Sequence, residues 1–382
     1  MTEPMPEPPS APRNVPSSGP PSAPPLYVPA LPARPSALAA YDHLSPDVRV
    51  RVAPLWTVPP RVGGERNPAR PPAQPRDPDP VALRRHTHDV LALVARVQGD
   101  RPAWVDTRHV EREPGLPGLG TVRPPLRPVT GIERDPTQQV ACAEAARAGR
   151  TGLGIRVGPN NPRNPGIGEG TAEALCRLLK RIAFAHCPVD LLLDLGAVDE
   201  GQGAEHTALQ ALNLLGSLHP WRTVVLLAGA FPRTCPGRCG APLAETYRAD
   251  RLLPDLLGHT GSGSGPRPTH GDYGAHDAAS ADRVSDIGDD PFRGALRYTA
   301  EHTFLIGEVP AESGHHRTVR AVAREIVTSP HFRGAEYSEG DRWLRTCADG
   351  SGLPGTGHPD LWIWAGHVQH LTHMARELRR HS

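Results

Sequence analysis

The sequence predicts an α/β fold: a (β/α)8 TIM-barrel-like domain with a C-terminal β-hairpin and helical appendage. Eight short strand-like runs are separated mostly by segments with helical spacing. One of them, VDLLLDLG at 189–196, is so continuously apolar that it predicts a strand covered on both faces. The main alternative, a doubly wound open sheet, is disfavoured because no GxGxxG fingerprint follows the first strand.

The chain begins with a segment that has almost nothing to bury. Residues 1–25 are rich in Pro, Ser, Ala and Glu and predict a disordered tail, whereas residues 26–382 predict a single barrel domain with its appendage from about 277. The expected strands end near Gly, Pro or charged residues. They cover 26–31, 50–58, 103–108, 128–135, 152–157, 189–196, 223–228 and 270–274.

Helices are expected between most of these strands because apolar residues recur at helical spacing. They cover 36–44, 81–97, 136–148, 169–185, 204–218 and 243–257. Only a Gly/Pro-rich stretch joins the third and fourth strands, although parallel neighbours usually need a helix-length return. Beyond 277, the runs at 295–298 and 303–307 are spaced like a hairpin, and helices are expected at 316–328 and 368–380.

Composition excludes several classes of function. The net charge of +1 over 382 residues gives no global field toward nucleic acid or anionic membranes. Lys180 is the single lysine, so a Walker A loop or a Schiff-base mechanism is disfavoured. The six cysteines lack the density of a disulfide framework. Because the sequence shows no signal peptide and no long apolar run, we expect a cytoplasmic protein.

Charged residues follow several predicted strands, and in a barrel the carboxyl ends of all strands meet at one mouth, where ligands bind. We expect catalytic or metal-binding carboxylates there, with arginines and a tyrosine that bind a small anionic substrate. The carboxylates are Asp106, Glu133, Asp194 and Asp272, and the substrate-binding residues are Arg108, Arg134, Arg156 and Tyr273, with Asp341 of the appendage as a further carboxylate. The alternative is an ion-pair network that only orders the loops, and for Asp341 an ordinary acidic turn.

Other metal signals are weaker. His367, His370 and His373 stand three apart, and Cys235 and Cys239 are spaced for a zinc knuckle, but neither set is complete. A divalent metal held by the carboxylates at the mouth stays open. The sequence contains no GxSxG or HExxH motif and gives no strong nucleic-acid signal, since basic and aromatic residues do not interleave.

The order of several motifs resembles the bacterial and phage "beta protein" family, and the likeness covers roughly residues 26–380. The motifs are YVP at 27–29, WVDTRH at 104–109, TGIERDP at 130–136, VDLLLDLG at 189–196, LAGAFP at 227–232, HGDYG at 270–274, LRYT at 296–299, FRGAEYSEGDRW at 332–343 and GHVQHLT at 366–372. The resemblance implies the architecture and a phage-related or mobile bacterial context, but no assigned biochemistry.

Two functions are compatible with these observations. The first is a barrel enzyme that acts on a phosphate- or carboxylate-bearing substrate. The second is a non-catalytic recognition module, phage- or defence-related by the resemblance, that uses the barrel as a scaffold. Carboxylates that converge on an open pocket would favour the enzyme. Carboxylates that are each paired with an arginine and covered by the C-terminal helices would favour the module.

Overall fold

A computed structural model describes most of the chain outside the N-terminal segment and several loops. The described residues are 25–60, 80–111, 122, 124–158, 168–199, 203–232, 243–251, 253, 267–279, 294–309, 315–350 and 356–380. Residues 1–24 of the predicted tail and the pair Cys235 and Cys239 lie outside them. Among the described residues, no helix has the length and apolar character needed to cross a bilayer.

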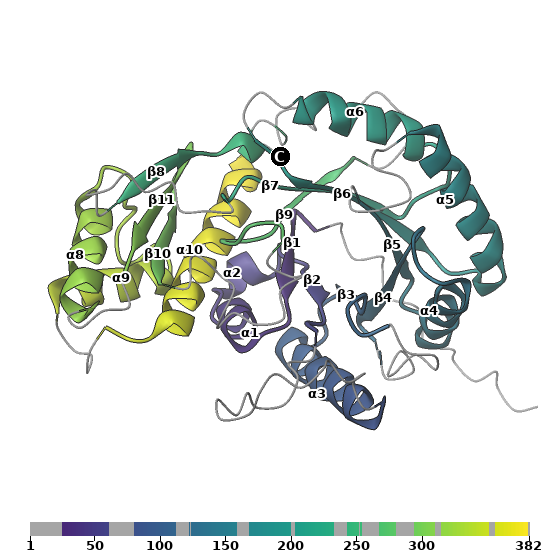
Figure 1. Cartoon of the computed structure of the whole chain (residues 1–382), viewed down its shortest axis with the longest axis horizontal. Helices are drawn as coiled ribbons and strands as arrows, with labels where there is room; N and C mark the ends of the chain where they lie inside the picture. The colour runs from purple at the N-terminus through teal and green to yellow at the C-terminus, as the bar shows by residue number, and fades with distance from the viewer. Residues whose placement is uncertain are drawn as a thin grey trace, which may run out of the picture.

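Eight parallel strands close into a barrel in the order β1-β2-β3-β4-β5-β6-β7-β9, with β9 pairing β1 (Figure 1). This confirms the predicted fold class. The strands are β1 (Tyr27–Pro32), β2 (Leu55–Thr57), β3 (Ala103–Asp106), β4 (Leu126–Gly131), β5 (Leu153–Val157), β6 (Val189–Ala197), β7 (Thr223–Gly229) and β9 (Thr269–Asp272). The strand expected over 50–58 is shorter because residues 46–49 form a helical turn and Pro54 has no N–H for a sheet ladder.

Helices cover the outside of the barrel, and α4, α5 and α6 form the arc on the right of Figure 1. Helix α4 begins where its sequence predicts, because Pro136 occupies the first turn and the Asp135 side chain accepts the Thr137 N–H at 2.7 Å. The helices are α1 (Pro35–Asp42), α2 (Pro46–Arg49), α3 (Pro80–Gln98), α4 (Pro136–Gly149), α5 (Glu169–Ile182) and α6 (Ala204–Leu215).

Side-chain alternation divides each strand between the barrel interior and the helical layer. The interior is a buried apolar cluster that includes Trp104 of β3 and Leu192 of β6, whereas Leu191 and Leu193 pack into the larger outer cluster. Strand β6 is therefore covered on both faces, as predicted. Gly154 of β5 leaves room for the interior, since a Cβ there would lie 2.8 Å from the Trp104 ring.

The appendage is built on a three-stranded antiparallel sheet with the order β10-β11-β8, on the left of Figure 1. The predicted hairpin is confirmed as β10 (Ala295–Thr299) and β11 (Thr303–Glu308), and it is flanked by α8 (His315–Thr328) and α9 (Glu339–Asp349). The helix expected over 243–257 is wrong in its first half. Residues Ala244–Tyr247 form β8 on β11, and a 3-10 turn, η3 (Ala249–Arg251), follows.

Helix α10 (Pro359–Arg380) joins the two halves of the molecule and starts nine residues before the predicted 368. It packs on α1 and β1 of the barrel and on α9 and β10 of the appendage. Leu371 and Met374 belong to the outer barrel cluster, whereas Trp362 and Ala365 belong to the appendage cluster. These contacts place α10 on the outer wall of the barrel.

Candidate functional site

Polar side chains form a layer at the carboxyl end of the barrel, directly above the apolar interior. Asp106 follows Trp104 on β3, Arg156 follows Gly154 on β5, and Asp194 follows Leu192 on β6, each two residues along its strand and therefore on the same face. Tyr273 comes directly after β9 and also packs in the interior cluster. All of these polar side chains are buried. Three predicted charged residues and the predicted tyrosine therefore meet in one place.

Arg156 is the centre of this layer. Its Nη1 donates to Asp106 Oδ2 at 2.9 Å, and its Nε and Nη2 donate to Asp194 Oδ2 at 2.9 and 2.6 Å. Asp194 Oδ1 accepts the hydroxyl of Tyr273 and the N–H of Gly196. Burial opposes the charge of Arg156, but the two carboxylates outweigh burial and raise its pKa. We call Asp106, Arg156, Asp194 and Tyr273, together with Arg134, the mouth network.

Arg134 joins the mouth network from the turn after β4. Its Nη2 lies 2.8 Å from Asp106 Oδ1, its Nη1 lies 2.5 Å from Glu111 Oε2, and its Nε lies 2.8 Å from Glu133 Oε1. Burial alone would raise the pKa of Asp106, but Arg134 and Arg156 outweigh it and hold that pKa well below the usual range. Asp106 is therefore ionised throughout the physiological range.

Glu111 was not predicted from the sequence, yet it is a member of this site. Its Oε1 accepts the hydroxyl of Thr107 at 2.6 Å and the side-chain N–H of Gln138 at 2.8 Å. Burial raises the pKa of Glu111 in spite of the neighbouring Arg134. The sequence feature that could have indicated Glu111 is its position five residues after Asp106. The turn after β3 brings Glu111 back to the mouth.

Two glycines leave the space that the polar side chains occupy. A Cβ on Gly131, the last residue of β4, would collide with the carboxylate of Glu133, and a Cβ on Gly229 of β7 would lie 2.6 Å from the ring of Tyr273.

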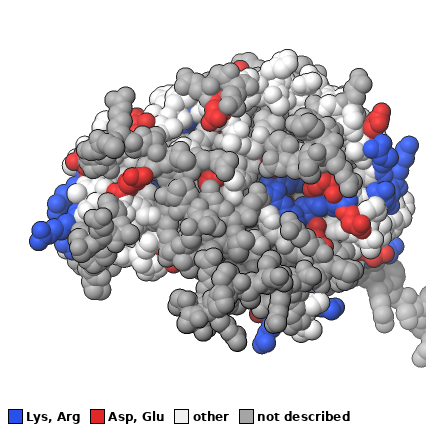
Figure 2. Space-filling view, viewed as in Figure 1, with Lys and Arg blue, Asp and Glu red and all other residues white. Residues whose placement is uncertain are grey.

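Glu133 is the most accessible carboxylate of the site, with 34% of its side chain exposed. Figure 2 shows basic and acidic side chains gathered side by side on the barrel half of this face.

Arg108 lies next to the mouth network. Its backbone N–H donates to Asp106 Oδ1 at 3.1 Å, and its half-buried guanidinium donates from Nε to His109 Nε2 at 3.2 Å. Its charge is among the influences that lower the pKa of Asp106. The predicted residue therefore lies near Asp106, and its side chain donates to His109.

The opposite end of the barrel has an ion-pair network of its own. Asp190, at the start of β6, accepts from Arg222 Nε at 2.8 Å and Nη2 at 2.5 Å, from Trp104 Nε1 at 2.9 Å and from Arg127 Nη1 at 3.3 Å. Charged groups at the amino end of a barrel contribute to stability, whereas ligands bind at the carboxyl end. This network therefore offers a matched control for experiments at the mouth.

The structure corrects the predicted position of Asp272. Gly271 faces the interior, since a Cβ there would lie 2.5 Å from Leu227, so Asp272 faces outward. Its Oδ1 accepts the Tyr27 hydroxyl at 2.5 Å, and its Oδ2 lies 3.0 Å from Nε2 of His370 on α10. Asp272 thus lies beneath α10 on the barrel wall and not in the mouth.

Asp341 also lies apart from the mouth. It occupies the first turn of α9 in the appendage, where its Oδ2 accepts the Ser338 hydroxyl at 2.5 Å and its Oδ1 accepts the Tyr298 hydroxyl at 3.0 Å. The Ser338 hydroxyl in turn accepts the Asp341 N–H at 3.1 Å, which caps the helix. Burial raises the pKa of Asp341 to about 6. These contacts place Asp341 between α9 and β10 of the appendage and not with the mouth network.

The fold and the site together define a (β/α)8-barrel protein with a buried network of charged side chains in its carboxyl-terminal mouth. A sequence model of the Beta protein family matches residues 27–376, and the chain therefore belongs to that family. This confirms the resemblance seen in the ordered motifs. A search of curated proteins gave no match. Membership of this family assigns no reaction, so the function has to be argued from the site.

Proposed function

We propose that the barrel mouth is the active site of an enzyme that acts on a small substrate bearing a carboxylate or phosphate group. The observation that supports this most is the contrast between two carboxyl groups that share Arg134. The pKa of Asp106 is lowered by its two arginines, whereas burial raises the pKa of Glu111. In many active sites, two carboxyl groups have pKa values shifted in opposite directions, so that one acts as the acid and the other stays ionised.

Glu111 is the proton donor and acceptor in this proposal. A carboxyl group with a raised pKa exchanges protons more readily near neutral pH than an ordinary one. Its side chain is 10% exposed and is held by Thr107 and Gln138, so it is oriented and still reachable. Asp106 and Asp194 hold the guanidinium groups of Arg134 and Arg156 in place through their ion pairs.

Arg134 binds the substrate anion in exchange for Glu133. The Glu133 side chain is 34% exposed and lies in the turn after β4, so its carboxylate can move into solvent at little cost in free energy. A carboxylate or phosphate group can then accept the Nε–H of Arg134 without leaving any buried charge unpaired. Asp106 and Arg156 are too deeply buried for such an exchange. Arg108 adds a further positive charge close to Asp106.

Thermal-shift titration tests the binding step. The probes are inorganic phosphate, sugar phosphates and short dicarboxylates, because binding to the folded state raises the Tm. Arg134→Gln should abolish the response. Glu133→Gln should increase affinity by a factor of about 1.4 to 5, since it removes a competing exposed pair worth about 0.2–1 kcal/mol. Glu111→Gln should bind normally but fail in turnover with any substrate that the screen identifies.

Arg222→Gln is the matched control, because it breaks the ion pair with Asp190 at the other end of the barrel. It should lower the Tm and leave the ligand response intact. The proposal fails if none of the probes raises the Tm of the wild type. It also fails if Arg222→Gln abolishes the response as completely as Arg134→Gln does.

A recognition module in a phage- or defence-related system is the second candidate. The observation that favours it is that arginines pair with the mouth carboxylates Asp106, Asp194 and Glu133. Such pairing is expected of an ion-pair network that orders the loops and binds no substrate. On that account no small anion raises the Tm, and Arg134→Gln lowers stability and nothing else. The same titration therefore separates the two candidates.

A further inference from the structure

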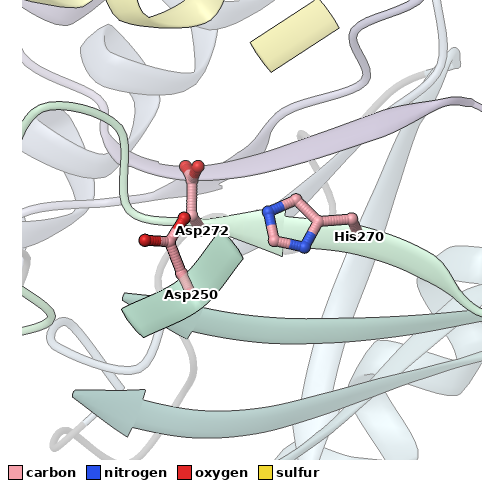
Figure 3. A group of neighbouring side chains, drawn as sticks. All are labelled: Asp250, His270 and Asp272. Atoms are coloured by element: carbon pink, nitrogen blue, oxygen red, sulfur yellow. The ribbon is translucent and has the colours of Figure 1, made fainter. Parts of the chain in front are cut away.

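A second polar cluster lies outside the barrel interior. It contains Asp250 of η3 with His270 and Asp272 of β9, and one ligand atom of each lies within 4.8 Å of the other two. Figure 3 shows the imidazole of His270 turned toward the two carboxylates. All three residues are at least 97% buried. Two segments whose ligands lie twenty residues apart in the sequence, at Asp250 and His270, thus bring nitrogen and oxygen ligands to one place.

Several atoms of this cluster have no hydrogen-bond partner among the described residues. They are both ring nitrogens of His270 and Oδ1 of Asp250. Leaving buried polar groups unsatisfied is costly, and native proteins do so rarely. An imidazole nitrogen without a hydrogen-bond partner is a common metal ligand in proteins. These atoms point to an ion as the missing partner.

The lone pairs of Asp272 can be counted. Its Oδ1 accepts the Tyr27 hydroxyl and the Gly274 N–H at 2.5 and 2.7 Å, and its Oδ2 accepts only Nε2 of His370 at 3.0 Å. A carboxylate oxygen accepts two bonds, so one lone pair of Oδ2 remains. The other nitrogen of His370 lies 2.8 Å from the Thr299 hydroxyl. His370 therefore orients the carboxylate in the way that second-layer partners orient metal ligands.

The charges around the cluster also suit a divalent cation. Asp250, Asp272 and Glu377 face two arginines: Arg248 lies 3.0 Å from Asp250 and 3.3 Å from Glu377, and Arg251 lies 3.8 Å from Glu377. Burial lowers the pKa of the adjacent His373 to about 4, so it adds no charge at neutral pH. Three carboxylates therefore face two arginines, and the ion-pair partner of Asp272 is the imidazole of His370 at 3.0 Å. A divalent cation at this place would offset the excess of buried negative charge.

We propose that Asp250, His270 and Asp272 bind a divalent first-row transition-metal ion such as Zn²⁺. One imidazole with two carboxylates favours such an ion over Ca²⁺ or Mg²⁺, which prefer oxygen ligands alone. Bonds of about 2.0–2.2 Å would draw the three side chains closer together around the ion. The bound ion ties β9 of the barrel to η3 and, through His370, to α10. Its role is structural and independent of the barrel mouth.

Metal binding by the full chain tests this proposal. Protein treated with a chelator is titrated with Zn²⁺, and both the retained metal and the Tm are measured. The wild type should retain one Zn²⁺ per chain and gain several degrees in Tm. His270→Gln and Asp250→Asn should lose both effects. His367→Gln is the matched control, because His367 is also buried with an unpartnered Nε2 but lies outside the three-residue group.

The proposal is overturned if the wild type retains less than one ion per chain, or if His270→Gln retains it as well as the wild type does. X-ray absorption of Zn²⁺-loaded wild type decides the case if the variants fail to fold. One imidazole with oxygen ligands supports the assignment. A shell with sulfur or with several imidazoles contradicts it.

Discussion

Replacing Asp194 with asparagine should destabilise the protein strongly. In the wild type, Asp194 Oδ2 accepts two hydrogen bonds from Arg156 at 2.9 and 2.6 Å, and Arg156 is only 4% exposed. The asparagine variant leaves that guanidinium with Asp106 as its remaining carboxylate, at 2.9 Å. Breaking one partner of a buried ion pair costs about 3–5 kcal/mol. Two charge-assisted hydrogen bonds of about 1.5–3 kcal/mol each give a similar figure.

Urea unfolding of Asp194→Asn and wild type at neutral pH measures this loss. Glu133→Gln is the comparison, because its carboxylate is exposed and its pair with Arg134 should contribute less than about 1 kcal/mol. We expect a large fall in the midpoint for Asp194→Asn and almost none for Glu133→Gln. A loss below about 1 kcal/mol for Asp194→Asn would refute the reasoning, since Arg156 would then not depend on that carboxylate.

Two other predictions concern the barrel wall. Leu192→Asp should prevent folding, because Leu192 is fully buried in the barrel interior and a lone carboxylate there costs several kcal/mol; a soluble variant with a cooperative melt by circular dichroism would contradict this. Burial opposes the charge of Asp272, but His370 outweighs burial and lowers the pKa of Asp272 from 3.8 to about 2. The ionised carboxylate therefore stabilises the fold by about 2 kcal/mol above pH 4, and this stabilisation is lost as the pH falls toward 2. Asp272→Asn should therefore lose less stability than wild type between pH 5 and 2 in urea unfolding, and equal pH profiles would contradict that.

The sequence predicted the barrel because strand patterns are local. A continuous apolar run such as 189–196 is buried only if both faces of its strand are covered, as they are in a barrel. The charged residues that follow such strands then meet at the carboxyl end of the barrel. Asp106, Arg156 and Asp194 were found in this way. The sequence could not show on which side of the barrel wall Asp272 lies, because the short run HGDYG has no alternation of apolar and polar residues. A shift of one residue turns a side chain to the opposite face.

Other features depend on contacts between distant segments. Strand β8 forms because Ala244–Tyr247 pairs with β11, more than fifty residues later, and its neighbourhood of Leu and Arg residues also suits a helix. Glu111 belongs to the site through the turn after β3, which has no strand pattern. Asp250 and His270 meet only when η3 packs against β9, so no spacing rule for metal ligands could have paired them.

We propose that the mouth network serves a ligand and is not required for the stability of the barrel. The most direct test is the free energy of unfolding of the neutral variant Asp106→Asn/Arg156→Met/Asp194→Asn, in which no charge is stranded and Arg134 keeps Glu111 and Glu133. Neutral replacement of a whole buried ion network is often harmless, so we predict stability within about 1 kcal/mol of wild type. A loss as large as that of Asp194→Asn alone would contradict the claim and assign the network to holding the barrel together.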